Sequence, residues 1–305
     1  MSLRIGLGQI CSSSNVKANA RVVSKLINKA LACQLDVLFL PEASDYISSS
    51  SEHGLLLVES VETDFVAAIK GLVRGTPLQV AVGIHSPGVN KEKVKNELLW
   101  ISDGEVKHRY QKIHLFDVNV PQGPILQELK SVERGDTLCK PFSIGDGDGD
   151  ETGKWKVGLG ICYDIRFPEM GLALRLAGAN IITYPLAFTT KTGEAHWKAL
   201  GIARALDTQS YVIMAAQCGS HDTLYLRPES NNGAVVKRIS YGASLVVDPW
   251  GVVVCEAKKY SDSALTDDID QDGDYYQLVE AVLDWQLLAT IRQNMPLEDH
   301  RVQWK

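Results

Sequence analysis

A strand-to-helix turn can be read in Lys156-Val157-Gly158-Leu159-Gly160-Ile161-Cys162-Tyr163-Asp164, which is followed by Arg166-Phe167-Pro168-Glu169. The apolar run predicts a strand that delivers Cys162 to a sharp bend, and a helix begins just beyond it. This arrangement is typical of a nucleophile elbow, in which nearby backbone N–H groups can bind an anionic oxygen. The alternative is a buried, inert thiol, which is what most cysteines are.

Two other apolar segments also end in a charged residue. Glu42 follows Phe39-Leu40-Pro41, and Lys112 follows Tyr110-Gln111. Open α/β sheets gather their sites where strands end, so the two charges and Cys162 are expected to meet. Each also has a structural interpretation, because Glu42 can cap a helix and Lys112 can be a solvated surface charge.

Strands and helices alternate along the rest of the chain without a linker or a repeat. This order predicts one α/β domain with a mixed sheet covered by helices. The expected strands are Leu3–Ile10, Asp36–Leu40, Leu78–Ile84, Leu98–Ile101, Val106–Tyr110, Pro141–Ile144, Lys156–Ile161, Ile181–Pro185, Tyr211–Ala216, Tyr241–Asp248, Val252–Glu256 and Gln277–Leu283. The expected helices are Asn15–Cys33, Val61–Val73, Arg166–Ala177, Ala195–Asp207 and Asp284–Asn294.

Three segments are expected to lie outside this regular pattern. Asp103-Gly104, between two of the strands, is a strong hairpin signal. The acidic, Gly-rich segment Gly145–Asp150 resembles a calcium loop, but no glutamate follows at EF-hand spacing, so a solvated turn is expected. Ser220–Arg238 is polar and irregular, which predicts a surface excursion.

Composition excludes several classes of function. The 305 residues carry a net charge of -6, whereas nucleic-acid binding needs clustered Lys and Arg. No apolar run is long enough to cross a bilayer, and the N-terminus lacks a secretory signal, so a cytosolic protein is expected. The six cysteines show neither a disulfide framework nor metal-site spacing.

Three motifs, taken in order, resemble the nitrilase superfamily of carbon–nitrogen hydrolases. They are Leu40-Pro41-Glu42, Tyr110-Gln111-Lys112-Ile113-His114-Leu115-Phe116-Asp117 and Gly160-Ile161-Cys162-Tyr163-Asp164-Ile165-Arg166-Phe167-Pro168-Glu169. The resemblance extends from Arg4 to about Pro296. It implies a nitrilase-like α-β-β-α sandwich, with residues 1–305 as a single domain and 284–305 as its C-terminal helix and tail.

The resemblance also implies an amidase with a Glu–Lys–Cys triad. Glu42 would be the general base, Lys112 the donor to the oxyanion and Cys162 the nucleophile, with no metal or cofactor. Glu128 is the candidate for the family's second glutamate, although Leu129 departs from the small polar residue that usually follows it. The competing constellation is a papain-like Cys–His pair.

If Cys162 instead pairs with a histidine, the plausible partners are His114 and His196. A hydrogen bond to a backbone group is the expected role of His114, because a lone histidine in such a run is usually structural.

Further motifs resemble the branch that hydrolyses deaminated glutathione. They include Ala187-Phe188-Thr189-Thr190-Lys191-Thr192-Gly193-Glu194-Ala195-His196-Trp197 and Ser240-Tyr241-Gly242-Ala243-Ser244. The implied substrate is α-ketoglutaryl-Cys-Gly, which gives 2-oxoglutarate and Cys-Gly in a metabolite-repair reaction. The candidates for the keto-acid end are Arg166, Thr189, Thr190 and Lys191. Arg227, Lys237 and Arg238 either meet the dipeptide end or belong to a solvated loop.

Several alternatives stay open from the sequence. An ω-amidase acting on α-ketoglutaramate differs only in its leaving group, and another small-amide hydrolase or an inactive scaffold with the same fold is also compatible. The family pairs its subunits, so a homodimer is expected. The C-terminal run Asp284–Lys305 is more apolar than a free tail, which predicts that it packs on its own domain and extends toward a partner subunit.

Overall fold

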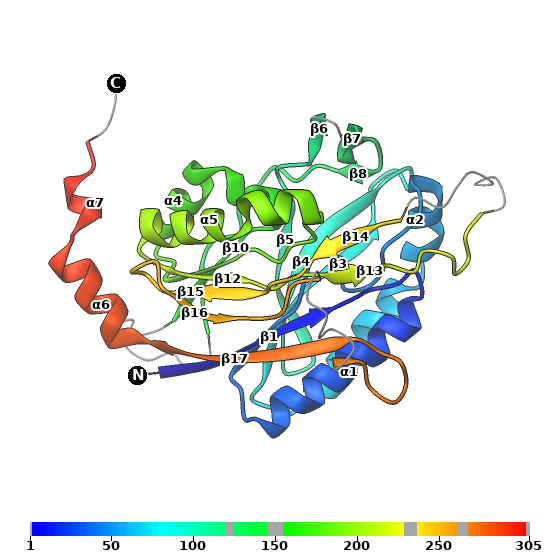
Figure 1. The fold of residues 1–305 in the computed structure, drawn as a ribbon, viewed down its shortest axis with the longest axis horizontal. Coiled ribbons are helices and arrows are strands. Elements are labelled where there is room, and N and C mark those ends of the chain that lie inside the picture. Colours follow the sequence, from blue (N-terminus) through cyan, green and yellow to red (C-terminus); the bar gives the residue numbers. More distant parts are fainter. Residues whose placement is uncertain (1, 120–124, 145–154, 229–236, 261–267, 303–305) are drawn as a thin grey trace.

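The computed structural model describes residues 2–119, 125–144, 155–228, 237–260 and 268–302. Its strands form two large sheets that pack face to face, and two small two-stranded sheets (Figure 1). The first large sheet has seven strands, in the order β17-β1-β2-β3-β4-β5 with β8 beside β4. Their bounds are β17 Tyr276–Asp284, β1 Ser2–Ile10, β2 Val37–Phe39, β3 Gln79–Pro87, β4 Val94–Ser102, β5 Glu105–Gln111 and β8 Val132–Glu133.

The second large sheet has six strands, in the order β16-β15-β12-β11-β10-β9. Their bounds are β16 Val253–Glu256, β15 Leu245–Val247, β12 Tyr211–Met214, β11 Ile181–Thr183, β10 Lys156–Leu159 and β9 Phe142–Ser143. The small sheets pair β13 (Cys218–Ser220) with β14 (Ile239–Tyr241), and β6 (Asp117–Asn119) with β7 (Ile125–Gln127).

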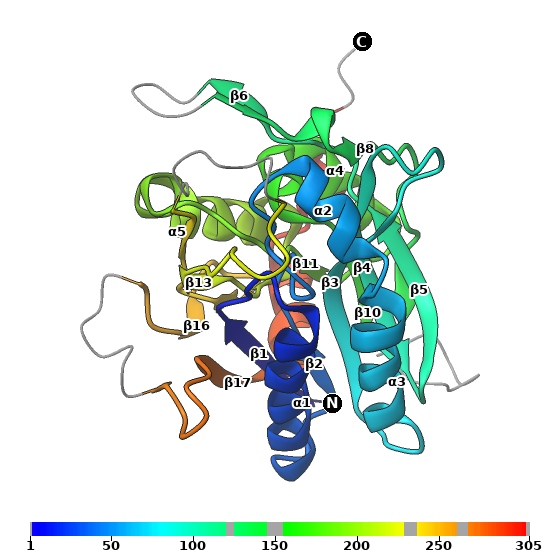
Figure 2. The same ribbon diagram turned by 90° about the vertical axis from the view of Figure 1, so that its right-hand side faces the viewer.

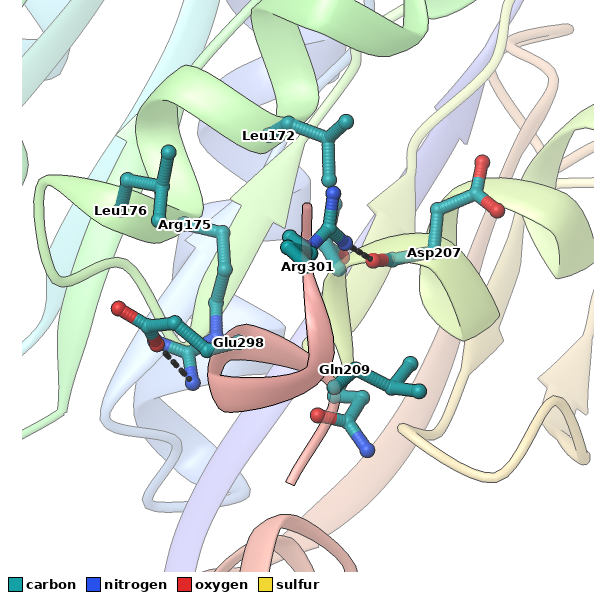
Figure 3. A pocket seen from close by; sticks show the side chains of 9 residues that line it. Leu172, Arg175, Leu176, Asp207, Gln209, Glu298 and Arg301 are labelled. Carbon is teal, nitrogen blue, oxygen red and sulfur yellow. Dashed lines mark hydrogen bonds and ion pairs between the residues drawn. The ribbon is translucent and has the colours of Figure 1, made fainter. Parts of the chain in front are cut away.

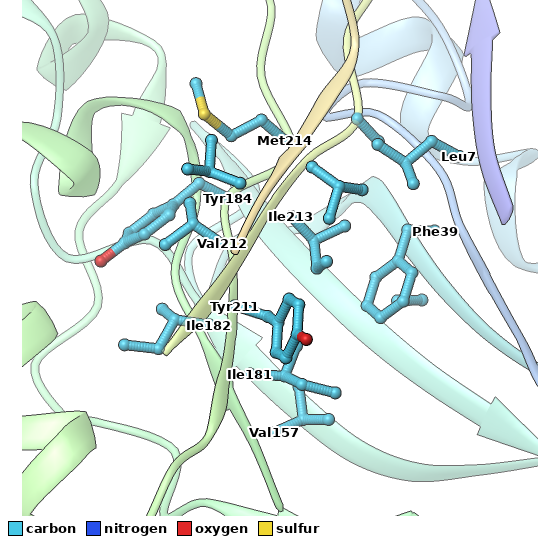
Figure 4. Close-up of a cluster of buried hydrophobic side chains, with 14 of the residues drawn as sticks. Leu7, Phe39, Val157, Ile181, Ile182, Tyr184, Tyr211, Val212, Ile213 and Met214 are labelled. Carbon is cyan, nitrogen blue, oxygen red and sulfur yellow. The ribbon is translucent and has the colours of Figure 1, made fainter. Parts of the chain in front are cut away.

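Alternation along the strands divides the apolar side chains between two cores. In β2, Val37 and Phe39 point to the second sheet, whereas Leu38 points to the helices on the other face. Figure 4 shows Leu7 and Phe39 of the first sheet opposite Tyr211 and Ile213 of the second. The two sheets therefore share one apolar layer.

Helices cover the outer face of each sheet. On the first sheet lie α1 (Val16–Ala32), α2 (Ser51–Val58), a π-helix (Val61–Val66) and α3 (Ala67–Val73), as Figure 2 shows from the side. On the second lie α4 (Pro168–Leu176) and α5 (Thr190–Thr208). Short 3₁₀ helices span Glu128–Lys130 and Cys162–Arg166. The order of layers is α-β-β-α, which confirms the fold that the family resemblance implies.

The prediction of one mixed sheet from element order alone is wrong, because the strands divide between two sheets. Strand periodicity identifies each strand but not the sheet that it joins. Other predictions need smaller corrections: α2 was not expected, and α5 begins five residues before Ala195 because Thr189 caps it. The third hairpin joins β15 to β16, while Tyr241 belongs to β14.

The predicted hairpin at Asp103-Gly104 is confirmed. It joins β4 to β5, and its two turn residues have φ of +48° and +73°, the left-handed pair that a type I′ turn requires. The second predicted hairpin also forms, since β9 pairs antiparallel with β10. Its acidic turn, Gly145–Asp150, lies outside the described residues.

The C-terminal segment packs on its own chain. Asp284 caps α6 (Trp285–Asn294), and α7 (Leu297–His300) follows. Figure 3 shows α7 against α4 and the end of α5, where Glu298 pairs with Arg175 at 3.0 Å and Arg301 donates to the Asp207 carbonyl at 2.6 Å. A cavity of about 10 Å³ remains between them. The prediction that this run packs on its own domain is thus confirmed as far as residue 302.

Candidate active site

Glu42 is fixed where β2 gives way to a tight turn. The Gly83 N–H donates to the Pro41 carbonyl at 3.1 Å, and a Cβ on Gly83 would lie 2.6 Å from the Glu42 Cα. Only glycine allows β3 to approach this closely. Gln217 donates to the Glu42 carbonyl at 3.0 Å from the other side, and the carboxylate itself is buried.

Lys112 follows β5 and turns its side chain into the protein, with only 2% of it exposed. Its Nζ lies 2.9 Å from Glu42 Oε1 and 2.9 Å and 3.0 Å from the two carboxylate oxygens of Glu128. Gly135 donates to the Lys112 carbonyl at 2.8 Å, which holds the backbone in place. A lysine buried this deeply needs opposite charges around it. The alternative interpretation of Lys112 as a solvated surface charge is therefore excluded.

Cys162 lies three residues beyond the end of β10, in a strained conformation. Its φ is +48°, in the left-handed region that non-glycine residues rarely adopt. Its backbone N–H donates to the Pro185 carbonyl at 2.9 Å, and a 3₁₀ helix begins at the same residue. The predicted sharp bend between strand and helix is confirmed, and the strain aims the thiol at the other two groups.

The three side chains meet, because Glu42 hydrogen-bonds both Cys162 and Lys112. Burial raises the pKa of Glu42, but the charge of Lys112 and the hydrogen bonds that the carboxylate accepts lower it below its usual value. Burial and the charge of Glu42 raise the pKa of the Cys162 thiol well above its usual value. Burial disfavours the charged form of Lys112 and so lowers its pKa. The charges of Glu128 and Glu42 nevertheless hold that pKa well above its usual value.

These pKa directions define the resting state of the site. It holds a neutral thiol beside a carboxylate and an ammonium group. The thiol becomes nucleophilic only when it loses its proton, and the carboxylate that hydrogen-bonds it is placed to accept that proton. Geometry and protonation therefore suit covalent catalysis by the cysteine.

Asp164 ties the cysteine turn to the lysine segment. Its buried carboxylate accepts from the Ile161 N–H at 2.8 Å and the Tyr110 hydroxyl at 2.7 Å on one oxygen. The other oxygen accepts from the His114 N–H at 3.1 Å and lies 2.7 Å from His114 Nδ1. One carboxylate thus connects the residues before Cys162 with those on either side of Lys112.

Asn96 is a member of the site that sequence reasoning missed. Its Nδ2 donates to Glu42 Oε1 at 2.8 Å and lies 3.5 Å from Glu128 Oε1. Glu128 in turn accepts from the Phe116 N–H at 2.6 Å, which fixes its second oxygen. The sequence gives little signal for this role, because Lys95 and Glu97 flank Asn96 in β4 and make it one of several polar residues there.

The candidates for the keto-acid end gather beside Cys162. The Ala187 backbone hydrogen-bonds the Cys162 side chain, two residues before Thr189. The guanidinium of Arg166 lies 5.6 Å from the centre of the Phe188 ring. Thr189 caps α5 by accepting from the Thr192 N–H, and Thr190 and Lys191 form the first turn of that helix. The structure thus places Arg166 against Phe188, next to the residues that begin α5, and contact of the four candidates with substrate stays a prediction.

Neither candidate for a Cys–His pair hydrogen-bonds the cysteine. His114 stacks on Phe167 at 3.6 Å and pairs with Asp164, so its partner is a carboxylate rather than the expected backbone group. His196 Nδ1 lies 3.0 Å from Arg166 Nη2. Glu42, not a histidine, is the basic side chain that contacts Cys162 in the described part of the chain.

A group of three carboxylates with metal-binding spacing lies elsewhere, at Asp270, Asp272 and Asp274. Lys25 extends into this group, with Nζ 2.6, 2.6 and 2.8 Å from the three carboxylates. Arg21 also pairs with Asp274 at 2.7 Å, so two cationic side chains offset most of the charge of the three carboxylates. Among the described helices, none has both the length and the apolar character needed to cross a membrane.

Arg227 and Arg238 lie on either side of residues 229–236 of the polar excursion, which are outside the described part. The Arg238 carbonyl accepts from the His221 N–H at 2.9 Å. Contact of these arginines, or of Lys237, with a substrate stays a prediction.

Known proteins with similar sequences are named as hydrolases or amidases. Residues 4–274 match the sequence profile of the family described as carbon–nitrogen hydrolase. The chain is 38% identical over 294 residues to "Probable hydrolase nit2" of Schizosaccharomyces pombe, and the match covers 95% of each protein. It is 36% identical over 303 residues to "Deaminated glutathione amidase" of Mus musculus, which covers 97% of this chain and 82% of the mouse protein.

The fold is similar to that of the NitFhit protein of C. elegans, with a TM-score of 0.81 and 30% identity. The alignment covers 98% of this chain and 65% of the worm protein, so this chain spans about two thirds of that protein.

Proposed function

The chain belongs to the carbon–nitrogen hydrolase family and acts on amides, and from that premise we propose that its substrate is deaminated glutathione, α-ketoglutaryl-Cys-Gly. The observation that carries the proposal of covalent catalysis is the strained Cys162, hydrogen-bonded to a buried Glu42 that also contacts Lys112. The choice of substrate is supported by the name of the mouse relative, to which 97% of this chain aligns.

In the first half-reaction the Cys162 sulfur attacks the amide carbonyl carbon while Glu42 accepts the thiol proton. The carbonyl oxygen becomes negatively charged, and the ammonium group of Lys112 stabilises that charge. A donor of this kind typically contributes about 3–4 kcal/mol to the stability of the transition state. Glu42 then protonates the leaving nitrogen, the C–N bond breaks, and an α-ketoglutaryl thioester and free Cys-Gly remain.

In the second half-reaction water attacks the thioester. Glu42 accepts a proton from that water, the C–S bond breaks, and 2-oxoglutarate leaves while the thiol recovers its proton. Glu128 holds Lys112 throughout, with both of its oxygens near Nζ. The steps need only these side chains and water.

Arg166 is the proposed partner of the α-keto carboxylate. It lies four residues after Cys162, and a guanidinium group binds a carboxylate with two parallel hydrogen bonds. Thr189, Thr190 and Lys191 begin the helix on the same side of the cysteine and offer further polar groups to the keto-acid end.

A comparison of two amides tests the proposal. The wild-type enzyme should hydrolyse deaminated glutathione with a kcat/KM more than tenfold above that for α-ketoglutaramate, because binding energy from the dipeptide orients the amide. Intact glutathione should be poorer still, because its ammonium group replaces the keto oxygen near Arg166. If α-ketoglutaramate proves the better substrate, the enzyme is an ω-amidase and the proposed substrate is wrong.

We also propose that residues 1–305 act as one catalytic domain and that the chain forms a cytosolic homodimer. Six free cysteines support a reducing compartment. Light scattering at micromolar concentration should give twice the chain mass of 33.5 kDa, and a particle of 33.5 kDa would contradict the dimer.

A further inference from the structure

His85 lies beside the catalytic side chains although no step described above uses it. In the antiparallel pair of β3 and β4, His85 is directly opposite Asn96, whose side chain bonds Glu42. Opposite residues in such a pair point to the same face of the sheet, with Cβ atoms about 5 Å apart. The imidazole of His85 is therefore the next side chain along this face from the Asn96–Glu42 contact.

The His85 ring is held in one orientation. Its Nδ1 lies 3.0 Å from Asp45 Oδ1, its backbone N–H donates to Asp45 Oδ2 at 2.6 Å, and its ring stacks on Tyr46 with centroids 4.4 Å apart. Asp45 is fully buried, and Asn19 donates to its carbonyl at 2.7 Å. A side chain fixed by packing and hydrogen bonds in this way is preorganised for recognition.

The second ring nitrogen of His85 remains available. Within the described part of the chain, Nε2 has no hydrogen-bond partner, and 14% of the side chain is exposed. Burial lowers the pKa of His85, but the charge of Asp45, its hydrogen bond to the ring and the charges of Glu42 and Glu128 together raise the pKa above its usual value. Nδ1–H donates to Asp45, and in the imidazolium form, which the Asp45 carboxylate stabilises, Nε2–H is a second donor.

The proposed mechanism places the leaving group on this side of the site. Glu42 protonates the departing nitrogen, so that nitrogen must come within about 3 Å of the carboxylate. Arg166 lies on the cysteine side, with the α5 N-terminus. The two residues of a leaving Cys-Gly span at most about 7 Å, a length that suits the roughly 5 Å step from Asn96 to His85.

We propose that the Nε2–H of His85 binds an oxygen of the leaving dipeptide and so selects deaminated glutathione over α-ketoglutaramate, which leaves as ammonia. Asp45 is the positioning residue that orients the ring. This inference rests on the proposed function, because an ω-amidase would have no dipeptide to bind at His85.

Two substitutions at His85 separate binding from structure. His85→Asn keeps an amide near the position of Nδ1, where it can still pair with Asp45, but removes the donor at Nε2. It should lower kcat/KM for deaminated glutathione by at least about tenfold, mainly through KM, since a hydrogen bond involving a charged group is lost. The factor by which kcat/KM for α-ketoglutaramate falls should be at least five times smaller than the factor for deaminated glutathione. His85→Gln carries its amide near the position of Nε2 and should recover part of the loss.

His108→Asn is the matched control, because His108 stacks on Phe142 and has no place in the site. It should not change the ratio of the two kcat/KM values. The contrary outcome is that the wild-type enzyme prefers deaminated glutathione while His85→Asn lowers kcat/KM for the two amides by the same factor, or for neither. In that case His85 does not contact the dipeptide. If the wild-type enzyme prefers α-ketoglutaramate, the proposed function fails first, before any variant is measured, and the role of His85 fails with it.

Discussion

Replacing Asp164 by asparagine should weaken the fold and the catalytic site together. Four donors converge on this buried carboxylate, two on each oxygen: the Ile161 N–H and Tyr110 hydroxyl on Oδ2, and the His114 N–H and Nδ1 on Oδ1. Asparagine keeps one accepting oxygen and turns the other into an NH₂ donor. The Tyr110 hydroxyl can rotate to accept from that donor, but the backbone N–H groups cannot.

The magnitude follows from this count. Whichever way the amide points, either the Ile161 or the His114 backbone N–H loses its acceptor, and an unpaired buried group costs about 1–3 kcal/mol. The bonds that remain lose their charge assistance, which adds about 1 kcal/mol each. With two bonds remaining on the one accepting oxygen, the free energy of unfolding should therefore fall by about 3–5 kcal/mol. Because Asp164 joins the Cys162 and Lys112 segments, a shift approaching 1 Å should also lower kcat by about 100-fold.

Urea unfolding followed by tryptophan fluorescence measures the first effect, and steady-state kinetics measures the second. Asp136→Asn is the matched control, because Asp136 is exposed and, among the described residues, its side chain bonds only Thr137 Oγ1. Its stability should change by less than about 0.5 kcal/mol. An Asp164→Asn variant that is as stable and as active as this control would refute the argument that one carboxylate joins the two catalytic segments.

Three further results are expected. Glu42→Gln keeps the shape of the side chain but removes the base, so kcat should fall at least about 100-fold, and activity within tenfold of wild type would contradict that role. Gly83→Ala would place a methyl group 2.6 Å from the Glu42 Cα and should lower both stability and activity, whereas Gly71→Ala has nothing within 4 Å and should do neither. Burial lowers the pKa of His221 to about 4, so between pH 6.5 and 4 only the unfolded chain binds the proton. Stability should thus fall by about 2 kcal/mol from pH 7.5 to pH 5, as urea unfolding can measure, and His221→Asn should lose that part of the slope.

The sequence predicted the strand ends well, for a physical reason. Short apolar runs followed by a single charged residue mark the points where Glu42 and Lys112 leave the sheet, and both residues lie at the site. The turn at Cys162 was also predictable, because a glycine-containing strand before it and Pro168 after it bound the bend on both sides.

The members of the site that hydrogen-bond across the sheet were not predictable. Asn96 and His85 are ordinary polar residues in strands, and only the register of β3 with β4 places them opposite each other. Asp45 and Asp164 act through contacts with residues 40 and 50 positions away in the sequence. Local periodicity cannot reveal such pairs, and the division of the strands between two sheets escapes it for the same reason.

The central claim is that the reaction passes through a thioester on Cys162. The direct measurement is the intact mass of the enzyme after brief mixing with deaminated glutathione and an acid quench. The wild-type enzyme and Cys255→Ala should each gain the mass of one α-ketoglutaryl group, and Cys162→Ala should gain nothing and show no turnover. A Cys162→Ala enzyme that still forms the adduct, or that retains a tenth of the wild-type rate, would contradict the account.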